Sequence, residues 1–424
     1  MPTSTDLVTD LPADFEVFGQ AVDTSLADLK GGTTNQILAK NSNTDMDFKW
    51  VANDVGDITA VTAGTGITGG GTSGDITVFF DQANFGGGQF AASKNKIING
   101  NCSVNQRSFT SSTSSGSYLV DRFIGGHSGG IVTYSVQQFT PGTAPVAGYE
   151  AKQFMRLVVS GQSASGDFAT VAQEIEDVRT FAGQTITVSF WAKANSGTPS
   201  ISVDLLQKFG SGGSPSSSVS TAAGKNAITT SWARYSYTVA VPSISGKTIG
   251  TTDNTSSLRL RIWVSAGSTY NTETTTLGTQ TNTFDIWGVQ VEAGSTATPF
   301  QTATGTIQGE LAACQRYYFR NTNASASYVT FCPAVANSST QMAAILQFPV
   351  PMRIAPSVLE FSNLAFENYA STQYTLSALS ITGSTNTTIS TRLQATMSGA
   401  TAGHFGYLNG QNSSSAYLAV SAEL

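Results

Sequence analysis

The chain has 424 residues, of which 40% are hydrophobic and 11% are charged, with a formal net charge of −6 at pH 7. This hydrophobic share suffices for packed cores and excludes a disordered chain, while the scarce, net negative charge argues against a nucleic-acid partner. The N-terminus lacks the charged and apolar regions of a signal peptide, and no run approaches the about 20 apolar residues of a membrane span. We therefore expect a protein made in the cytoplasm, without membrane insertion.

A short helix is predicted at the start of the chain. Six apolar residues recur at steps of three and four and so share one helix face: Leu11, Phe15, Phe18, Val22, Leu26 and Leu29. Asp10 and Pro12 favour a helix start, and Gly31-Gly32 favours a stop. Isolated helices of this length are marginal in water, so the apolar face must pack on something. Two interpretations stay open: docking on the chain's own domain, or a short parallel coiled coil that joins identical chains.

Residues 36–95 are predicted to form a β-rich shaft. Short strand-like runs at 36–40 and 48–51 flank an Asn/Ser/Asp turn. Further on, two β-rich runs flank a glycine cluster, and Ile76, Val78 and Phe80 alternate toward one side. Such a segment has too little apolar surface to fold alone. Three copies wrapping together would bury the alternate face.

Two further β-domains are predicted. Residues 96–303 show repeated alternating runs, separated by turn-like stretches and by no helix of ten or more residues, which favours a β-sandwich or jelly roll. The clearest runs are 186–190, 201–205, 235–241 and 258–264. Residues 304–325 favour a helical linker that extends through Tyr317 and Tyr318, and 326–424 a separate C-terminal β-domain with Pro349, Pro351 and Pro356 at strand ends. The predicted fold class is all-β, preceded by the helix of residues 1–35.

Several strings imitate catalytic or ligand sites. GHSGG at 126–130 fits a nucleophile elbow and GTGITG at 64–69 a dinucleotide fingerprint, but each is followed by strand pattern rather than by the helix that such motifs require. Only His127 and His404 could serve a triad as base. The three cysteines, Cys102, Cys314 and Cys332, are too scattered for a disulfide or zinc framework and are expected to be buried.

The carboxylates are few, and the conspicuous cluster is Glu174, Glu176 and Asp177. A glycan-cleaving enzyme would need two carboxylates facing each other across a groove. We interpret this cluster instead as a solvated turn between strands, and we expect no enzymatic activity. For glycan binding, flat aromatic faces with neighbouring amides and hydroxyls are required. The C-terminal domain offers five candidates: Tyr369, Tyr374, Phe405, Tyr407 and Tyr417.

Several stretches resemble bacteriophage tail-fibre and minor tail proteins. TDLPADFEVFGQAVDTSLADLKGGTTNQILAKNSNTDMDFKWV resembles an attachment segment of phage fibres, and AGTGITGGGTSGDITVFFD a shaft element that follows it. The central region resembles a phage tail β-sandwich similar to carbohydrate-binding modules. It carries KIINGNCSVNQRSF, YLVDRF, VSFWAKA, FDIWGVQVEAGSTATPFQ and ELAACQRYYFR. Cys102 and Val104 depart from the family, which more often has an acidic residue and an aromatic there.

The resemblance implies a virion protein that forms a homotrimer, attaches to the phage tail, its baseplate or another virion protein through residues 1–35, and binds host cell-surface polysaccharide. Two alternatives stay open: a head or collar fibre or capsid decoration protein without a receptor role, and a capsular polysaccharide depolymerase. Sandwiches of this kind often hold a structural Ca²⁺, for which Asn99 and Asp285 are the matching positions. The alternative is that Asp285 is an ordinary strand-edge carboxylate. No other cofactor is expected.

Overall fold

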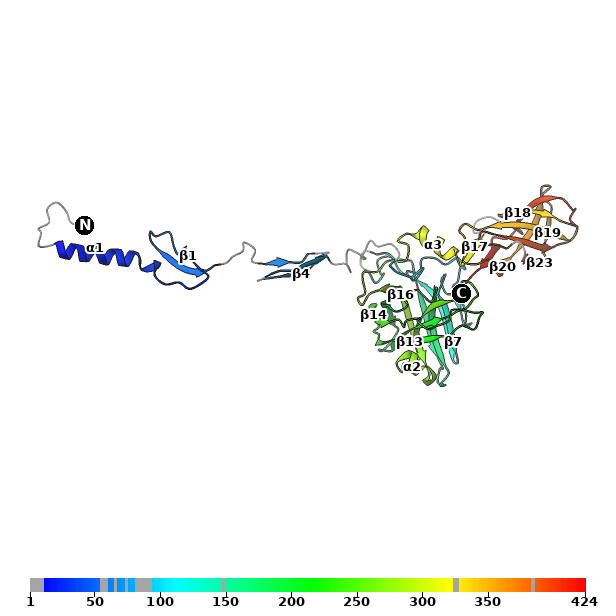
Figure 1. Cartoon of the computed structure of the whole chain (residues 1–424). Coiled ribbons are helices and arrows are strands. Elements are labelled where there is room, and N and C mark those ends of the chain that lie inside the picture. Colours follow the sequence, from blue (N-terminus) through cyan, green and yellow to red (C-terminus); the bar gives the residue numbers. More distant parts are fainter. Residues whose placement is uncertain are drawn as a thin grey trace. The chain divides into compact units, whose positions relative to one another are not determined.

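The computed structural model describes residues 11–53, 60–64, 67–72, 75–80, 94–146, 149–322, 328–382 and 386–424. The chain divides into two compact units, Met1–Asp81 and Gln82–Leu424. Within the described ranges, the first unit holds one α-helix and short strands, and strands dominate the second unit and the chain as described (Figure 1), which confirms the all-β prediction. None of the helices within the described ranges is both long and apolar enough to cross a membrane.

The first unit contains the predicted helix and short strands. Helix α1 (Leu11–Ser25) continues into the 3-10 turn η1 (Ala27–Leu29), and Gly31 and Gly32 then end it with φ angles of 96° and 84°. An antiparallel hairpin follows, formed by β1 (Gln36–Lys40) and β2 (Phe48–Ala52), as predicted. A second small sheet follows, made of β3 (Val61–Thr62), β4 (Ile67–Gly71) and β5 (Val78–Phe80). The predicted helix start at Asp10 lies outside the described residues.

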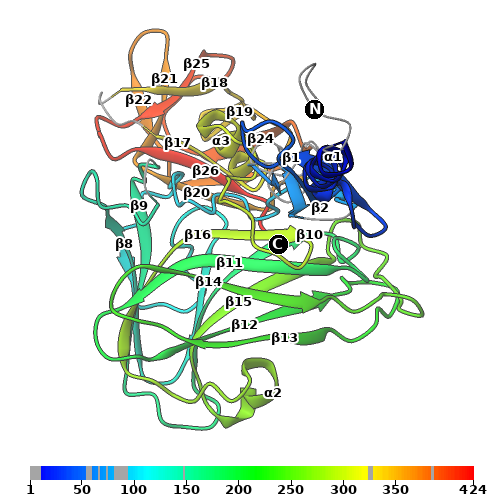
Figure 2. The same cartoon turned by 90° about the vertical axis from the view of Figure 1, so that its left-hand side faces the viewer.

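The second unit begins with a β-sandwich of two antiparallel sheets, which Figure 2 shows from the end of the domain. The five-stranded sheet has the order β13 (Val219–Ala227), β12 (Ser200–Lys208), β15 (Ser257–Ala266), β10 (Phe168–Glu176) and β7 (Ile124–Ser128). The six-stranded sheet has the order β14 (Ala233–Ala240), β11 (Thr185–Ala194), β16 (Asn282–Ala293), β9 (Gln153–Ser160), β8 (Ile131–Gln138) and β6 (Ser111–Ser112). The short helical turns η3 (Ser268–Tyr270) and α2 (Asn271–Thr274) were not predicted.

The sandwich core lies between these sheets. Alternate side chains of each strand point inward, because successive residues of a strand face opposite sides. Phe190, Ile262 and Trp287 belong to this core and are at most 1% exposed. The alternating runs in the sequence therefore identified the strands and their inward faces. All three cysteines are free and buried, as predicted.

A smaller β-domain follows helix α3 (Ile307–Gln315). Its three-stranded sheet has the order β17 (Tyr318–Thr322), β26 (Tyr417–Ser421) and β20 (Val358–Ser362). Its seven-stranded sheet has the order β22 (Gln373–Thr375), β21 (Leu364–Asn368), β25 (Phe405–Gly410), β18 (Thr330–Ala336), β19 (Gln341–Gln347), β24 (Ser390–Thr396) and β23 (Ala378–Ile381). The predicted helix through Tyr317 and Tyr318 was too long: α3 ends before them, and β17 begins at Tyr318 because that strand pairs with β26.

Glu423 ties this smaller domain to the sandwich. Its carboxylate pairs with the guanidinium of Arg122 and lies 3.4 Å from Nη2 of Arg107. Arg122 is 2% exposed and also donates to the carbonyl oxygen of Glu174 at 2.7 Å. Its guanidinium lies 3.3 Å from the ring centroid of Tyr317. A charge this deeply buried is costly to leave unpaired, so Glu423 holds the two β-domains together.

Removing the charge of Glu423 tests this coupling. Glu423→Gln should lower the free energy of unfolding by about 3 kcal/mol, because Arg122 would keep a buried charge without its partner. Chemical denaturation of the full chain measures the change. The matched control is Asp177→Asn, whose partner Arg179 has a side chain 62% exposed, and it should cost less than about 1 kcal/mol. Equal losses in the two variants would contradict the assigned role.

Candidate functional site

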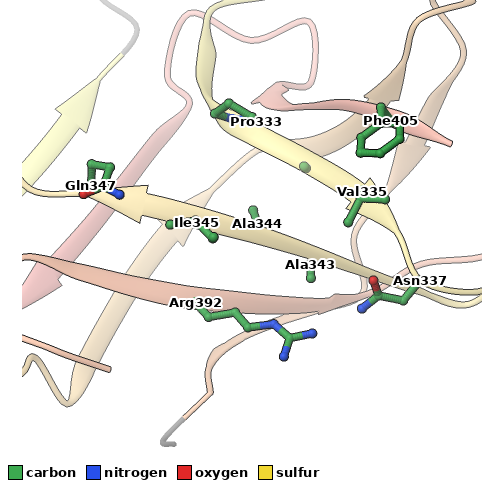
Figure 3. Close-up of a pocket in the computed structure, with 10 residues that line it drawn as sticks. Pro333, Val335, Asn337, Ala343, Ala344, Ile345, Gln347, Arg392 and Phe405 are labelled. Carbon is green, nitrogen blue, oxygen red and sulfur yellow. The ribbon is translucent and has the colours of Figure 1, made fainter. Parts of the chain in front are cut away.

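The solvent-facing side of the seven-stranded sheet carries a groove of about 560 Å³ (Figure 3). Strand alternation directs Val335 of β18, Ile345 of β19 and Arg392 of β24 to this face. The register places Val335 opposite Phe405 and Ala343, and Ile345 opposite Arg392. The groove floor is therefore mostly aliphatic. Its wall includes one aromatic ring, that of Phe405, which is 64% exposed.

Two tyrosines extend this face beyond the groove. The rings of Tyr369 and Tyr407 meet edge to face, with 5.7 Å between centroids. The neighbouring Tyr369 side chain raises the pKa of Tyr407. Tyr407 lies opposite Pro333 in β18 and opposite Glu367 in β21, and the Glu367 carboxylate accepts a hydrogen bond from the side-chain amide of Gln373 at 3.1 Å. Aromatic rings and polar groups thus lie side by side on one exposed surface.

This combination suits a carbohydrate. A pyranose has an apolar face of C–H groups that packs on aromatic or aliphatic surface, while its hydroxyls need donors and acceptors around it. We call the surface formed by Tyr369, Tyr407, Phe405, Pro333, Ile345 and Arg392 the outer face. It is open and shallow, so each copy is expected to bind weakly.

Three of the five predicted glycan-binding residues lie on the outer face, and two do not. Tyr374 points to the other side of β22, where its ring stacks on that of Phe366 with 5.9 Å between centroids. Tyr417 belongs to the three-stranded sheet, and the guanidinium of Arg320 covers its ring at 3.9 Å. The structure separates these two rings from the other three for one reason: aromatic content alone does not say which face of a strand a ring occupies.

A second groove, of about 350 Å³, lies on the outer side of the five-stranded sheet. Phe168, Trp263 and Tyr270 line it, and they were not predicted as site residues. Trp263 is only 2% exposed, because the rings of Phe168 and Tyr270 pack against it and its Nε1 donates to Asp204 at 2.7 Å. The tryptophan therefore presents no open ring face. The alternation of Arg259, Arg261 and Trp263 on the outward side of β15 is the pattern from which this cluster could have been found.

Glu174 and Glu176 do not form the solvated turn that we predicted. Glu174 lies within β10, is 6% exposed, and accepts hydrogen bonds from Lys208 at 2.9 Å and from Arg259 and Ser257 at 2.6 Å. Burial alone raises the pKa of Glu174, but Arg259, Ser257 and Lys208 together bring it below its ordinary value. The prediction failed because the cations that allow this burial are distant in the sequence.

Glu176 is likewise engaged. It accepts hydrogen bonds from Nε and Nη2 of Arg316 at 3.1 and 3.0 Å. Burial raises its pKa, but Arg316, Tyr317 and Arg353 together lower it below its ordinary value. A general acid of a glycosidase instead needs a raised pKa.

The two imitated motifs lie in strands, as predicted. GHSGG at 126–130 ends β7 and turns into β8, and Nδ1 of His127 lies 3.3 Å from the hydroxyl of Tyr134. Within GTGITG, residues 65 and 66 lie outside the described residues, and the rest continues into β4. Neither string therefore precedes the helix that its motif requires.

The structure does not bring Asn99 and Asp285 together. The side-chain amide of Asn99 donates to the carbonyl oxygens of Val104 and Asp121 at 2.8 and 3.0 Å. Asp285 instead accepts two hydrogen bonds from Arg156, at 2.6 and 2.8 Å. Across the described ranges no group of three or more His, Cys, Asp and Glu side chains could hold a metal ion. The arrangement gives no support to the calcium site predicted for this pair.

The predicted oligomerisation stripe is exposed. Phe15 is 63% exposed and Phe18 46%, while Val22, Leu26 and Leu29 lie at 38–39%. The side chain of Leu11 lies outside what the structure describes. Within the described part of residues 11–80, no residue is buried. Among the described residues of its own unit, the helix therefore finds no contact that buries these apolar side chains.

No protein-family model matches the sequence, and no curated protein does. Among solved structures, the enzymatically active domain of tailspike protein 4 of bacteriophage CBA120 is similar at 15% identity and a TM-score of 0.27, over 47% of this chain and only 22% of that chain. The CBM22-2 xylan-binding domain of Xyn10C from Paenibacillus barcinonensis is similar at 18% identity and a TM-score of 0.26, over 41% of this chain and 92% of that one. A Stig cyclase, Fisc from Fischerella sp., is similar at 15% identity and a TM-score of 0.29, over 49% of this chain and 100% of that one. Likenesses of this size identify neither a family nor an activity.

Substitution of Glu174 tests the buried ion pairs. Glu174→Gln should lower the free energy of unfolding at neutral pH by about 2 kcal/mol, because Arg259 and Lys208 lose their counter-charge. Since the folded pKa of Glu174 lies below the ordinary value of 4.5, its contribution is complete above that value and is lost as the pH falls through the folded pKa. Denaturation curves recorded at decreasing pH should therefore converge for the two proteins. A difference that grows toward acid pH would contradict the pairing.

Proposed function

We propose that this protein is a non-enzymatic, homotrimeric fibre of a bacteriophage virion. Residues 1–35 would attach it to the phage tail or to another virion protein, and its β-domains would bind host-surface polysaccharide. The resemblance of the N-terminal and central stretches to phage fibre proteins supports the virion location and the number of copies. Assembly and glycan binding are supported by separate features of the chain.

The observation that carries the proposal is the absence of any buried residue in the described part of residues 11–80. A lone helix of about 15 residues is marginal in water, and a small sheet without a covered face has little to stabilise it. Helix α1 nevertheless presents an unbroken apolar stripe. Identical copies in parallel would pack these stripes against one another and supply the missing core.

The outer face supports the glycan-binding part of the proposal. Its exposed rings and neighbouring polar groups match the two sides of a sugar, whereas the buried Trp263 of the sandwich groove offers no such platform. Three weak sites on one trimer would act together at high effective concentration on a repeating polysaccharide. Shallow binding by one copy is therefore compatible with firm attachment by three.

The carboxylates support a role without catalysis. Glu174 and Glu176, two of the three residues of the conspicuous acidic cluster, are engaged by basic side chains that lower the pKa of both. A glycosidase needs one carboxyl with a raised pKa and a second one free to act across a groove. Neither role fits these two residues.

Placing charges in the stripe tests the assembly. Val22→Asp together with Leu26→Asp should convert the trimer to monomers, because packed copies would have to bury up to six unpaired carboxylates. Light scattering coupled to size-exclusion chromatography measures the mass. The matched control is Gln20→Asp, two residues before Val22 and on the opposite side of the helix, which should leave the mass unchanged.

Two outcomes would contradict the assembly. One is a stable monomer of the full-length chain in dilute buffer. The other is unchanged incorporation into particles after deletion of residues 1–31, which should instead abolish incorporation while the β-domains stay folded. Immunogold labelling of intact particles then locates the fibre. Labelling of the head would favour a head or collar fibre over a tail fibre.

Removing the exposed rings tests glycan binding. Tyr407→Ala and Tyr369→Ala should each weaken binding to purified host-surface polysaccharide by about tenfold, the size expected for a stacking contact. Surface plasmon resonance on immobilised polysaccharide measures this. Phe361→Ala in β20 is the matched control, since Phe361 and Tyr407 are both 37% exposed but lie on different sheets. Equal binding by all three variants and the unsubstituted protein would remove the outer face as the site.

A further inference from the structure

Among the described residues of the C-terminal domain, one arginine at the surface has no partner for its guanidinium. Residues 326–424 contain no lysine and no aspartate, and their arginines are Arg353 and Arg392. Arg353 is 6% exposed and donates to the carbonyl oxygens of Ala422 and Glu423 at 2.9 and 3.0 Å. Arg353 therefore serves the junction with the sandwich. Arg320 of β17 donates from Nη1 to the carbonyl oxygen of Arg107 at 2.8 Å and covers the ring of Tyr417. Arg392 is left as the one permanently cationic side chain without such a partner that the described part of this domain offers to a ligand.

Arg392 also lacks the partner that every other arginine has. Ten of the eleven arginines of the chain make side-chain hydrogen bonds, as Arg156 does with Asp285 and Arg316 with Glu176. Among the described residues, no acceptor, carboxylate or aromatic ring pairs with the guanidinium of Arg392. Structural use of arginine is thus the rule in this protein, and Arg392 is the exception.

The unpaired guanidinium lines the groove of the outer face. Arg392 lies directly across from Ile345 in the register of β19 and β24. Figure 3 shows its side chain along the sheet surface, with Phe405 at the other wall. Phe405 and Arg392 belong to strands three positions apart in the sheet, a separation of about 14 Å at the usual strand spacing. This span exceeds one pyranose ring and suits a disaccharide or a longer segment.

We propose that the groove binds an acidic glycan whose uronic-acid carboxylate pairs with Arg392. One sugar ring would lie on Phe405 and the aliphatic floor, and the carboxylate of a neighbouring ring would accept hydrogen bonds from the guanidinium. The planar guanidinium matches a carboxylate in a bidentate geometry, and desolvation by the apolar floor strengthens the pairing. This inference rests on the proposed function and names the class of glycan.

Other polyanions fit the groove less well. A nucleic acid or an anionic membrane is held by several cations at once, and this face has one. The net charge of −6 also disfavours such partners. A polysaccharide of uronic acids carries one carboxylate on each sugar ring, and its other polar groups are uncharged hydroxyls. One arginine beside an apolar floor can therefore bind one carboxylate and one sugar ring of such a polymer.

The test uses the full-length protein and two probes, β-1,4-glucuronan and polygalacturonate, each compared with its carboxyl-reduced form. Reduction turns every carboxylate into an alcohol and leaves the sugar rings and linkages in place. The unsubstituted protein should bind at least one acidic polymer at least tenfold more tightly than the reduced form, with added salt weakening the binding. Arg392→Gln should abolish this preference, and Arg392→Lys should restore part of it. Arg179→Gln, an exposed arginine of the sandwich, is the matched control and should keep the preference.

The outcomes separate the inference from the proposed function. Equal binding of acidic and reduced polymers, lost in Phe405→Ala, would overturn the acidic class while glycan binding at the outer face stands. Binding to neither form of either polymer would also overturn the assignment to acidic glycans. The proposed glycan binding would then be tested only by the binding of Tyr407→Ala to host-surface polysaccharide. A carboxylate preference that survives Arg392→Gln would place the recognition elsewhere. Phe405 is mostly exposed, so its substitution leaves the core intact.

Discussion

Apolar side chains are buried in the second unit of this chain but stay exposed or half-buried in the described part of the first. The proposed assembly depends on this difference. The described part of residues 94–424 encloses two large apolar cores, around Trp287 in the sandwich and Phe366 in the C-terminal domain. In the described part of residues 11–80, by contrast, no side chain is buried at all. The hydrophobic effect stabilises structure in proportion to the apolar area removed from water. The apolar side chains of the N-terminal helix and small sheets are therefore left to be covered by other surface, which identical copies would supply in the proposed assembly.

Most ion pairs among the described residues join elements that are distant in the sequence. Asp285 joins β16 to Arg156 of β9, Glu174 joins β10 to β15, and Glu423 joins the end of the chain to Arg122. Such buried pairs add little net stability compared with apolar residues, but a break in any of them is costly. They therefore specify how the strands and domains meet. A carboxylate held in this way is a poor catalyst and a poor ligand for calcium.

Alternation in the sequence was sufficient to predict the helix and the clearest strands, among them β11, β12, β14 and β15, because an apolar pattern on one face leaves a period that can be read directly. The same pattern could not assign single side chains to a site. Tyr374 and Tyr407 each alternate with polar or small neighbours, yet the register turns one toward Phe366 and the other toward solvent. Glu174 was misjudged because Lys208 and Arg259 reach it only through strand pairing. Contacts between distant segments decide both cases, and a single sequence does not contain them.

Rigidity links the ion pairs to the proposed binding. Several weak sites raise the overall affinity only if their geometry allows simultaneous contact with one surface, and freely rotating domains lose part of that gain as entropy. The pairing of Glu423 with Arg122, together with the bonds from Arg353 to the end of the chain, restrains the C-terminal domain on the sandwich. The outer face is thus carried at a defined orientation relative to the sandwich. In a trimer, three such faces would meet a repeating polysaccharide in a fixed arrangement, so that a groove with one arginine and one phenylalanine per copy would suffice for attachment.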